Sequence, residues 1–142
     1  MKSLAEKMQV KQGDKVLVLN PPEGWTWRFG PADEQAEPGR LYDHILSFVR
    51  QEGEIRAGLP AWKASIGAGG KLWVAWPKAK KLGSDLKLDT VVKAVYPQGL
   101  VESVNLAVDE TWTALKFTWP KPGKVYRDHH AVLVRDPNQP AE

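Results

Sequence analysis

The sequence predicts a three-layer α/β domain with a mostly parallel sheet and a C-terminal antiparallel hairpin. Three observations predict this class. Three segments, 15–20, 42–49 and 71–76, contain consecutive apolar residues, as strands covered on both faces do. A helical pattern separates the second segment from the third, which is the order of a parallel crossover. Two β-rich stretches joined by a short turn follow.

The length of 142 residues fits one ordinary domain. We assign residues 1–119 to this domain and residues 120–142 to a C-terminal tail, in which 131–134 is a candidate edge strand. With 42% hydrophobic and 26% charged residues, the composition is typical of a soluble globular protein. No apolar run approaches the ~20 residues that span a bilayer, so we expect no membrane segment.

The chain contains no cysteine, which agrees with a reducing compartment. The first ten residues mix charges with apolar side chains and do not resemble a secretion signal, so we expect a cytoplasmic protein. The net charge of +3 arises from many charges of both signs. This balance favours solubility over the binding of nucleic acid or other polyanions.

The N-terminal half begins with a capping box, since Glu6 follows Ser3 at the required spacing.

The three apolar segments are all expected to be central strands. Between the second and third, apolar residues recur at helical intervals. They are Ile55, Leu59, Trp62 and Ile66. Gly58 and Pro60 predict a break or kink within that helix.

The C-terminal half continues with a short helix at 89–96, for which Asp89 is a plausible N-cap and Pro97 a stop signal. Strands are predicted at 101–108 and 113–119, with a hairpin turn between them. The second of these strands alternates apolar and polar residues, so one face should be packed and the other partly wet.

These segments carry a resemblance to class I S-adenosylmethionine-dependent methyltransferases. The strand containing Asp43 resembles their fourth strand, residues 67–74 resemble the glycine turn leading into the fifth, and the closing hairpin resembles the sixth and seventh. The resemblance covers 15–119 and implies a Rossmann-like fold. The stretches 17–24, 76–78 with 84–86, and 109–117 are also similar to a family of short bacterial proteins of unknown function.

The turn after the first strand departs from the methyltransferase pattern. A working enzyme of that class has a glycine-rich turn there, whose free amides and small size hold the cofactor. This chain has Asn20-Pro21-Pro22-Glu23-Gly24-Trp25 instead. The prolines lack donors, and Trp25 and Trp27 add bulk. We therefore expect no cofactor, with S-adenosylmethionine retained under an alternative interpretation.

The segment 21–41 is too short for the crossovers that would precede the Asp43 strand, since each takes a dozen or more residues. The second and third strands should be reduced or absent, and Glu34 and Glu37 should be solvated loop charges. The first strand would then approach the sheet edge, where exposed main chain invites pairing. The N-terminal helix, the 131–134 run or a second copy could cover it, and we favour a homodimer.

Ligands of open α/β sheets bind beyond the carboxyl ends of the parallel strands. This rule gathers ten residues into one candidate ligand cleft. They are Asn20, Pro22, Trp25, Arg50, Trp76, Lys78, Asp85, Asp109, Glu110 and Trp112. No catalytic residue is assigned, and the unknown ligand is a small molecule or a protein.

Simpler roles compete for these residues. For Lys78 with Asp109 or Glu110, an ion pair is favoured over a polar ligand site. For Asp85, capping or turn formation is favoured over contact with a ligand. The tryptophans can fill the former cofactor cleft instead of stacking on a ligand. His44 reads as a hydrogen-bonded core group, and we expect no metal. The basic stretch at Lys78, Lys80, Lys81 and Lys87 reads as a solvated loop.

Three classes of function remain. The leading one is a non-catalytic binding or regulatory module on a degenerate methyltransferase-like scaffold. The second is a methyltransferase with an atypical cofactor loop, and the third is a phosphate or nucleic-acid binder. Titration with S-adenosylmethionine separates the first two, and a steep salt dependence of nucleic-acid binding identifies the third.

Overall fold

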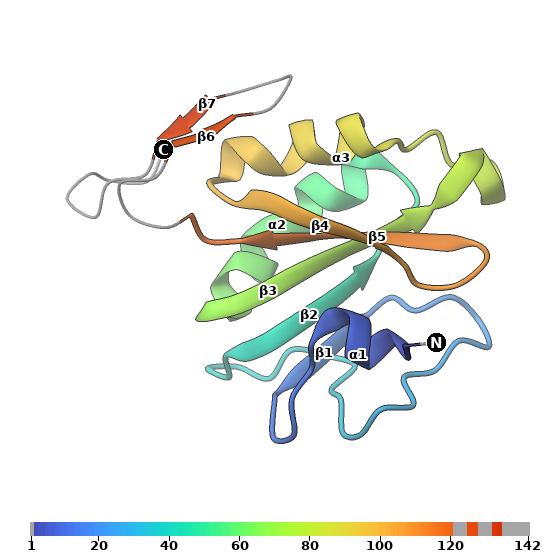
Figure 1. Ribbon diagram of the computed structural model, residues 1–142, viewed down its shortest axis with the longest axis vertical. Helices are drawn as coiled ribbons and strands as arrows, with labels where there is room; N and C mark the ends of the chain where they lie inside the picture. Colours follow the sequence, from blue (N-terminus) through green and yellow to red (C-terminus); the bar gives the residue numbers. More distant parts are fainter. Residues whose placement is uncertain (1, 121–124, 128–131, 135–142) are drawn as a thin grey trace.

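The computed structural model describes residues 2–120, 125–127 and 132–134. A five-stranded sheet with the order β1-β2-β3-β5-β4 forms its centre (Figure 1). Its strands are β1 (Val16–Leu19), β2 (Tyr42–Phe48), β3 (Ile66–Pro77), β4 (Val101–Ala107) and β5 (Trp112–Thr118). The first three are parallel, whereas β5 is antiparallel to both β3 and β4. The predicted mostly parallel sheet with a closing hairpin is confirmed.

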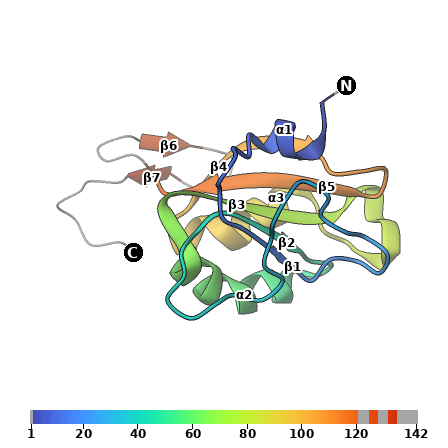
Figure 2. The ribbon, with the colours of Figure 1, turned by 90° about the horizontal axis from the view of Figure 1, so that it is seen from below.

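The helices form a layer on each face of the sheet (Figure 2). α2 (Glu52–Ser65) and α3 (Leu88–Val95) cover one face, and α1 (Leu4–Met8) lies on the other. Alternate residues of β2 serve the two layers: Ile45 packs in the cluster of α2 and α3, whereas Leu46 and Phe48 pack in the cluster of α1. The runs of consecutive apolar residues therefore reflect strands buried on both faces.

β1 is an edge strand, as the shortness of 21–41 predicted, whereas the expectation from the apolar pattern that all three segments are central was wrong for the first. The sheet order agrees with a methyltransferase-type sheet without its second and third strands. Beyond β1 lies a single parallel bridge to Asp33. Val18 donates its N–H to the Asp33 carbonyl (2.8 Å), and Asp33 donates to the Val16 carbonyl (2.9 Å). The loop that replaces the missing strands thus covers part of the edge, a role that sequence reasoning did not assign to it.

The Asp33 side chain fixes the same loop to the start of β2. The Tyr42 hydroxyl donates to Asp33 Oδ2, and Arg40 forms an ion pair with that oxygen at 3.2 Å. Burial and the hydrogen bond to Asp33 raise the pKa of the Tyr42 hydroxyl. Glu34 and Glu37 are exposed, as expected for loop charges. The loop is therefore anchored at Asp33 by both main chain and side chain.

The predicted helices are present with two corrections. The capping box of Ser3 and Glu6 is confirmed in α1. α2 is not broken at Pro60. Pro60 and Arg56 are both exposed, so the missing hydrogen bond between their main chains falls on the solvent side of the helix. The N-cap of α3 is Lys87, and Asp89 lies in its first turn.

Gly67, Gly69 and Gly70 belong to β3 and do not form a turn before it. A Cβ added at Gly70 would lie 2.8 Å from the main-chain oxygen of Tyr42. Glycine is needed there because the neighbouring main chain approaches closely.

The other edge of the sheet is β4, whose pairing with β5 is interrupted by a bulge between Glu102 and Asn105. The Asn105 amide donates to Thr113 Oγ1 and to the Ala114 carbonyl, at 3.0 and 2.9 Å. Lys7 Nζ donates to the carbonyl of Ala107 at the end of the strand (2.7 Å). Bulges and lysines are features that discourage edge-to-edge pairing.

The run predicted at 131–134 contains β7 (Val132–Val134), while residue 131 lies outside the described residues. β7 pairs with β6 (Val125–Arg127) in a separate two-stranded sheet. The candidate strand is therefore one strand of a separate hairpin and does not pair with the main sheet. The sequence showed only the second strand of this hairpin, because 125–127 forms too short a β-rich segment to be recognised.

Candidate functional site

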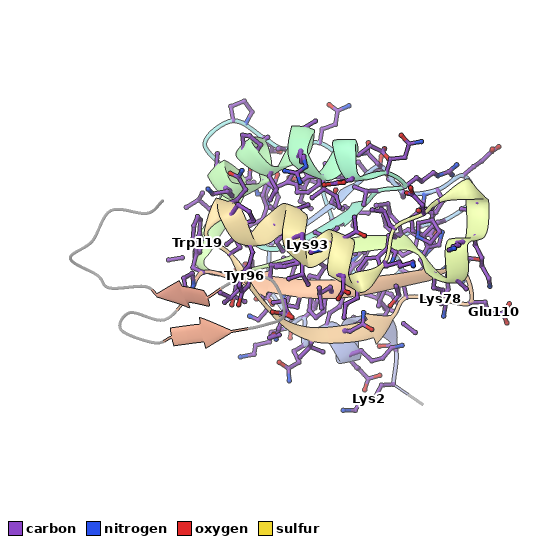
Figure 3. All side chains as sticks on the ribbon, turned by 90° about the horizontal axis from the view of Figure 1, so that it is seen from above. Lys2, Lys78, Lys93, Tyr96, Glu110 and Trp119 are labelled. Carbon is purple, nitrogen blue, oxygen red and sulfur yellow. The ribbon has the colours of Figure 1, made fainter. Side chains whose placement is uncertain are left out.

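The carboxyl ends of β1, β2 and β3 meet the β4–β5 hairpin at one end of the sheet. Pro77 pairs with Trp112, and the Lys78 N–H donates to the Thr111 carbonyl at 2.9 Å. Figure 3 shows Lys78 and Glu110 at this end of the molecule and Trp119 at the opposite end. The topology thus brings together the segments that the sequence predicted to form a ligand cleft.

A row of three aromatic side chains crosses this end on the α1 face of the sheet. Trp25 packs against Phe48 with ring centroids 4.8 Å apart and planes at 61°. Phe48 in turn packs against Trp112 at 5.0 Å and 81°. Both contacts are edge-to-face, a geometry that contributes about 0.5–1.5 kcal/mol beyond area burial. Phe48 and Trp112 are buried, and Trp25 covers them from the loop after β1.

Trp25 lines three separate hollows, of about 390, 300 and 220 Å³. The first is the most relevant to the predicted cleft, and we call it the end hollow. Its lining residues are Pro22, Glu23, Gly24, Trp25, Arg50, Leu82, Asp109, Thr111 and Trp112. Five of the ten predicted site residues are among them. The indole of Trp25 thus forms a wall shared by three spaces.

The loop before Trp25 is a tight turn. Asn20 leaves β1 in the left-handed region with φ of 55°, and Gly24 has φ of 80°. The Trp25 N–H donates to the Pro22 carbonyl at 3.0 Å, which closes the turn on itself. Neither Pro21 nor Pro22 has an N–H. Few amides therefore remain in this loop for a ligand.

The main chain of Arg50 is fixed from both sides. Its N–H donates to Glu54 Oε1 (2.7 Å), and its carbonyl accepts from the hydroxyl of Ser84 (2.7 Å). The buried Ser84 oxygen also accepts from the N–H of Leu86 at 3.2 Å. Sequence reasoning assigned the turn to the neighbouring Asp85 and missed Ser84. A serine two residues before a buried leucine is typical of a side-chain turn and could have indicated it.

The loop Lys78–Gly83 contains three non-glycine residues with left-handed main chain. Ala79, Lys80 and Leu82 have φ of 55°, 60° and 57°. This region disfavours residues with a Cβ, and such strain persists where neighbouring contacts enforce it. Leu82 is 53% exposed although it is apolar. The lysines at 80, 81 and 87 are also exposed, as predicted for a solvated loop.

The two acidic residues of the hairpin differ in their hydrogen bonds, since Asp109 uses its carboxylate and Glu110 its main-chain carbonyl. Asp109 Oδ1 accepts from the amides of Thr111 and Trp112, both at 2.8 Å. Lys81 Nζ donates to the Glu110 carbonyl at 2.8 Å. No ion pair joins Lys78 to either acid among the described residues, so the ion pair favoured by the sequence analysis is not formed. Asp109 is a turn-forming residue.

Two predicted residues lie away from the end hollow. Trp76 is buried in the cluster beneath α2 and α3, on the opposite face of the sheet from Trp25. Odd and even positions of a strand face opposite sides, which the sequence analysis did not apply to Trp76. Asp85 is exposed and lines a different hollow, of about 360 Å³, with Gln51 and Thr90.

His44 is buried and hydrogen-bonded, as the sequence predicted. Trp73 Nε1–H donates to His44 Nδ1 at 3.2 Å, so Nε2 carries the proton and faces Asp14 Oδ2 at 3.2 Å. Burial, with a contribution from Lys71, lowers the pKa of the imidazole. A hydrogen bond from the Lys11 amide lowers the pKa of the Asp14 carboxyl. His44 is thus a neutral polar link inside the core.

Within the described ranges, no three His, Cys, Asp or Glu side chains gather closely enough to bind a metal ion. None of the helices among these residues has the length and apolar character needed to traverse a bilayer.

Comparison with solved structures identifies the fold. The glycopeptide N-methyltransferase MtfA matches with a TM-score of 0.56 at 10% identity, over 81% of this chain and 87% of that one. A TehB-like SAM-dependent methyltransferase from Corynebacterium glutamicum matches with a TM-score of 0.54 at 11% identity, over 81% and 85%. This chain has a class I methyltransferase-like fold. LepI in complex with SAM matches at 0.52 and 13% identity, over 82% of this chain and 39% of that one.

The similarity is one of fold, because all these identities are low. This methyltransferase-like chain spans only 41% to 50% of the chain in four other solved methyltransferase structures that it matches, two of which are of the same enzyme. No protein-family profile matches the sequence, and no curated protein resembles it significantly. The narrower resemblance to a family of short bacterial proteins therefore stays a prediction.

Proposed function

We propose that this chain is a non-catalytic binding or regulatory module on a methyltransferase-like scaffold. The observation that carries the proposal is the position of Trp25. Its indole lies on Phe48 at the carboxyl end of β2, with ring centroids 4.8 Å apart. In open α/β sheets a ligand binds in the crevice at that end of the strands. An S-adenosyl ligand would have to displace the indole and break its contact with Phe48.

The turn between β1 and Trp25 supports the same proposal. A cofactor needs several free N–H groups and close main-chain approach in this loop. Pro21 and Pro22 provide no donor, and the N–H of Trp25 is already bonded to Pro22. The loop therefore has neither the donors nor the space of a glycine-rich turn. A cytoplasmic location and a small-molecule or protein ligand are part of the proposal.

Calorimetric titration of the purified protein with S-adenosylmethionine and S-adenosylhomocysteine tests it. We expect no heat of binding from either compound at millimolar concentration. Micromolar binding that also quenches tryptophan fluorescence would instead establish the alternative, a methyltransferase with an atypical loop. A positive result would be assigned to this end of the sheet if Trp25→Ala altered it. Trp119→Ala, at the opposite end of the molecule, is the matched control.

The methyltransferase alternative is supported by the sheet order and by the fold of the matched structures. The third class, a phosphate or nucleic-acid binder, is supported only by the exposed lysines of the loop after β3. Filter binding of single-stranded RNA at several salt concentrations addresses it. A steep loss of affinity with salt would favour that class, because released counterions drive such binding.

A sheet-edge homodimer remains a separate proposal. Asp33 bonds to β1, and a bulge interrupts β4, so neither edge is a long, regular strand. Sedimentation equilibrium across a hundredfold range of concentration would test the dimer. A constant monomer mass would reject it.

A further inference from the structure

Arg50 presents a charged group at the end hollow from a fixed main chain. Glu54 accepts from its N–H and Ser84 donates to its carbonyl, both at 2.7 Å. Its side chain is exposed and lines the end hollow. In the part of the chain that the structure describes, no ion pair includes its guanidinium. The two hydrogen bonds fix the main chain from which the guanidinium extends beside the hollow.

Leu82 lines the same hollow from the loop after β3. It is 53% exposed and has φ of 57°, so an apolar side chain is kept in water by a strained main chain. Neither feature favours folding, since burial of leucine and release of strain would both be stabilising. Ser84, two residues later, donates to the main-chain carbonyl of Arg50 and so joins this loop to the end of β2.

The remaining lining combines apolar with polar groups, and its apolar part comes mainly from three residues. Pro22, Trp25 and the buried Trp112 contribute to it. Asp109 is also present, but its Oδ1 already accepts two main-chain N–H groups. Glu23 is exposed and is the remaining acid in the lining. The hollow is open to solvent, and its volume of about 390 Å³ lies near the lower end of the range of about 300–1,000 Å³ common for small-molecule sites.

We propose that the end hollow binds a small anionic ligand with a flat apolar body. The anion pairs with the Arg50 guanidinium, whose planar donors match a carboxylate or a phosphate, and the body packs against Trp25 and Leu82. This inference rests on the proposed function, because an S-adenosyl ligand that displaced Trp25 would remove one wall of the site.

The experiment uses naphthalene-2-carboxylate, 2-naphthyl phosphate and the uncharged naphthalene-2-carboxamide, titrated into the whole protein. Tryptophan fluorescence reports binding near Trp25 and Trp112, and amide chemical shifts locate it. We expect saturable binding of at least one anion and about tenfold weaker binding of the carboxamide, as loss of a charge-assisted hydrogen bond implies. Preference for the carboxylate or for the phosphate distinguishes the two sources of negative charge, and either supports the proposal.

Two exposed positions provide variants with matched controls. Arg50→Gln should weaken anion binding about tenfold, whereas Arg56→Gln on the exposed side of α2 should leave it unchanged. Leu82→Ser should weaken all three probes, with the exposed Leu88→Ser as its control.

The proposal is overturned if no anion binds below 5 millimolar, roughly a −3 kcal/mol interaction, or if anion and carboxamide bind equally. The second comparison uses the wild-type protein and is independent of any variant's stability. S-adenosylhomocysteine is titrated into the same sample. If neither it nor the probes bind, this inference fails while the non-catalytic function stands; if it binds, the proposed function itself fails.

Discussion

Substitution of Gly58 by alanine tests the packing of α2. Alanine in place of glycine ordinarily stabilises a helix by about 1 kcal/mol. Here a Cβ at position 58 would lie 2.2, 2.5 and 2.9 Å from three ring atoms of Trp62. Trp62 is 6% exposed and packs in the core beneath α2 and α3, so its ring cannot simply swing into solvent.

The ring must retreat by more than 1 Å to restore an ordinary carbon–carbon separation of about 3.5–4.0 Å. Overpacking of this kind costs typically about 1–3 kcal/mol. After the gain of about 1 kcal/mol in helix propensity, Gly58→Ala should destabilise the protein by up to about 2 kcal/mol. Gly53 is the matched control in the same helix, since a Cβ there meets nothing within 4 Å. Gly53→Ala should be neutral or stabilising by up to about 1 kcal/mol.

Urea unfolding followed by circular dichroism measures both variants. A double variant adds a direct check: in a Trp62→Leu background the clash is absent, and Gly58→Ala should then become neutral or stabilising. A Gly58→Ala protein as stable as Gly53→Ala, with Trp62 intact, would show that the indole does not lie over Gly58.

Three further predictions concern buried polar groups. The pKa of the His44 imidazole is lower in the folded protein than in the unfolded chain, so on acidification the unfolded chain binds a proton at this group first. The stability that the neutral imidazole confers is therefore present above pH ~6.5 and is lost as the pH falls below that value. The melting temperature of the wild type should fall between pH 7.5 and 5.5, and that of His44→Gln should fall less. An equal fall in both proteins would show that His44 is not the source of the pH dependence. Ser84→Ala removes two hydrogen bonds and should destabilise by about 1–3 kcal/mol in urea, whereas the exposed Ser103→Ala should change little. Tyr42→Phe removes the donor to Asp33 and should increase proteolysis of the loop 21–41 together with a loss of about 1–3 kcal/mol; an unchanged cleavage rate would contradict the anchoring role.

The sheet was predictable because its signals are local. Consecutive apolar residues in 15–20 and 42–49 indicate buried strands, and the segment between them is too short for further crossovers. The position of β1 at the edge follows from that shortness, but the pairing with Asp33 does not. A single main-chain bridge to a loop leaves no pattern in the sequence.

The sequence predicted which chain segments meet at the candidate site better than which individual side chains line it. The end of each strand was placed correctly, which brought Pro22, Arg50 and Trp112 to one hollow. The face on which Trp76 lies depends on strand register, which a run of consecutive apolar residues does not reveal. Ser84 was missed because its partner, the Arg50 carbonyl, is 34 positions away in the sequence.

The most direct measurement is a crystal structure of the protein grown with millimolar S-adenosylhomocysteine. The account predicts that the Trp25 indole remains edge-on against Phe48, with no ligand above the carboxyl end of β1. Electron density for the ligand at that position, with the indole displaced, would contradict it.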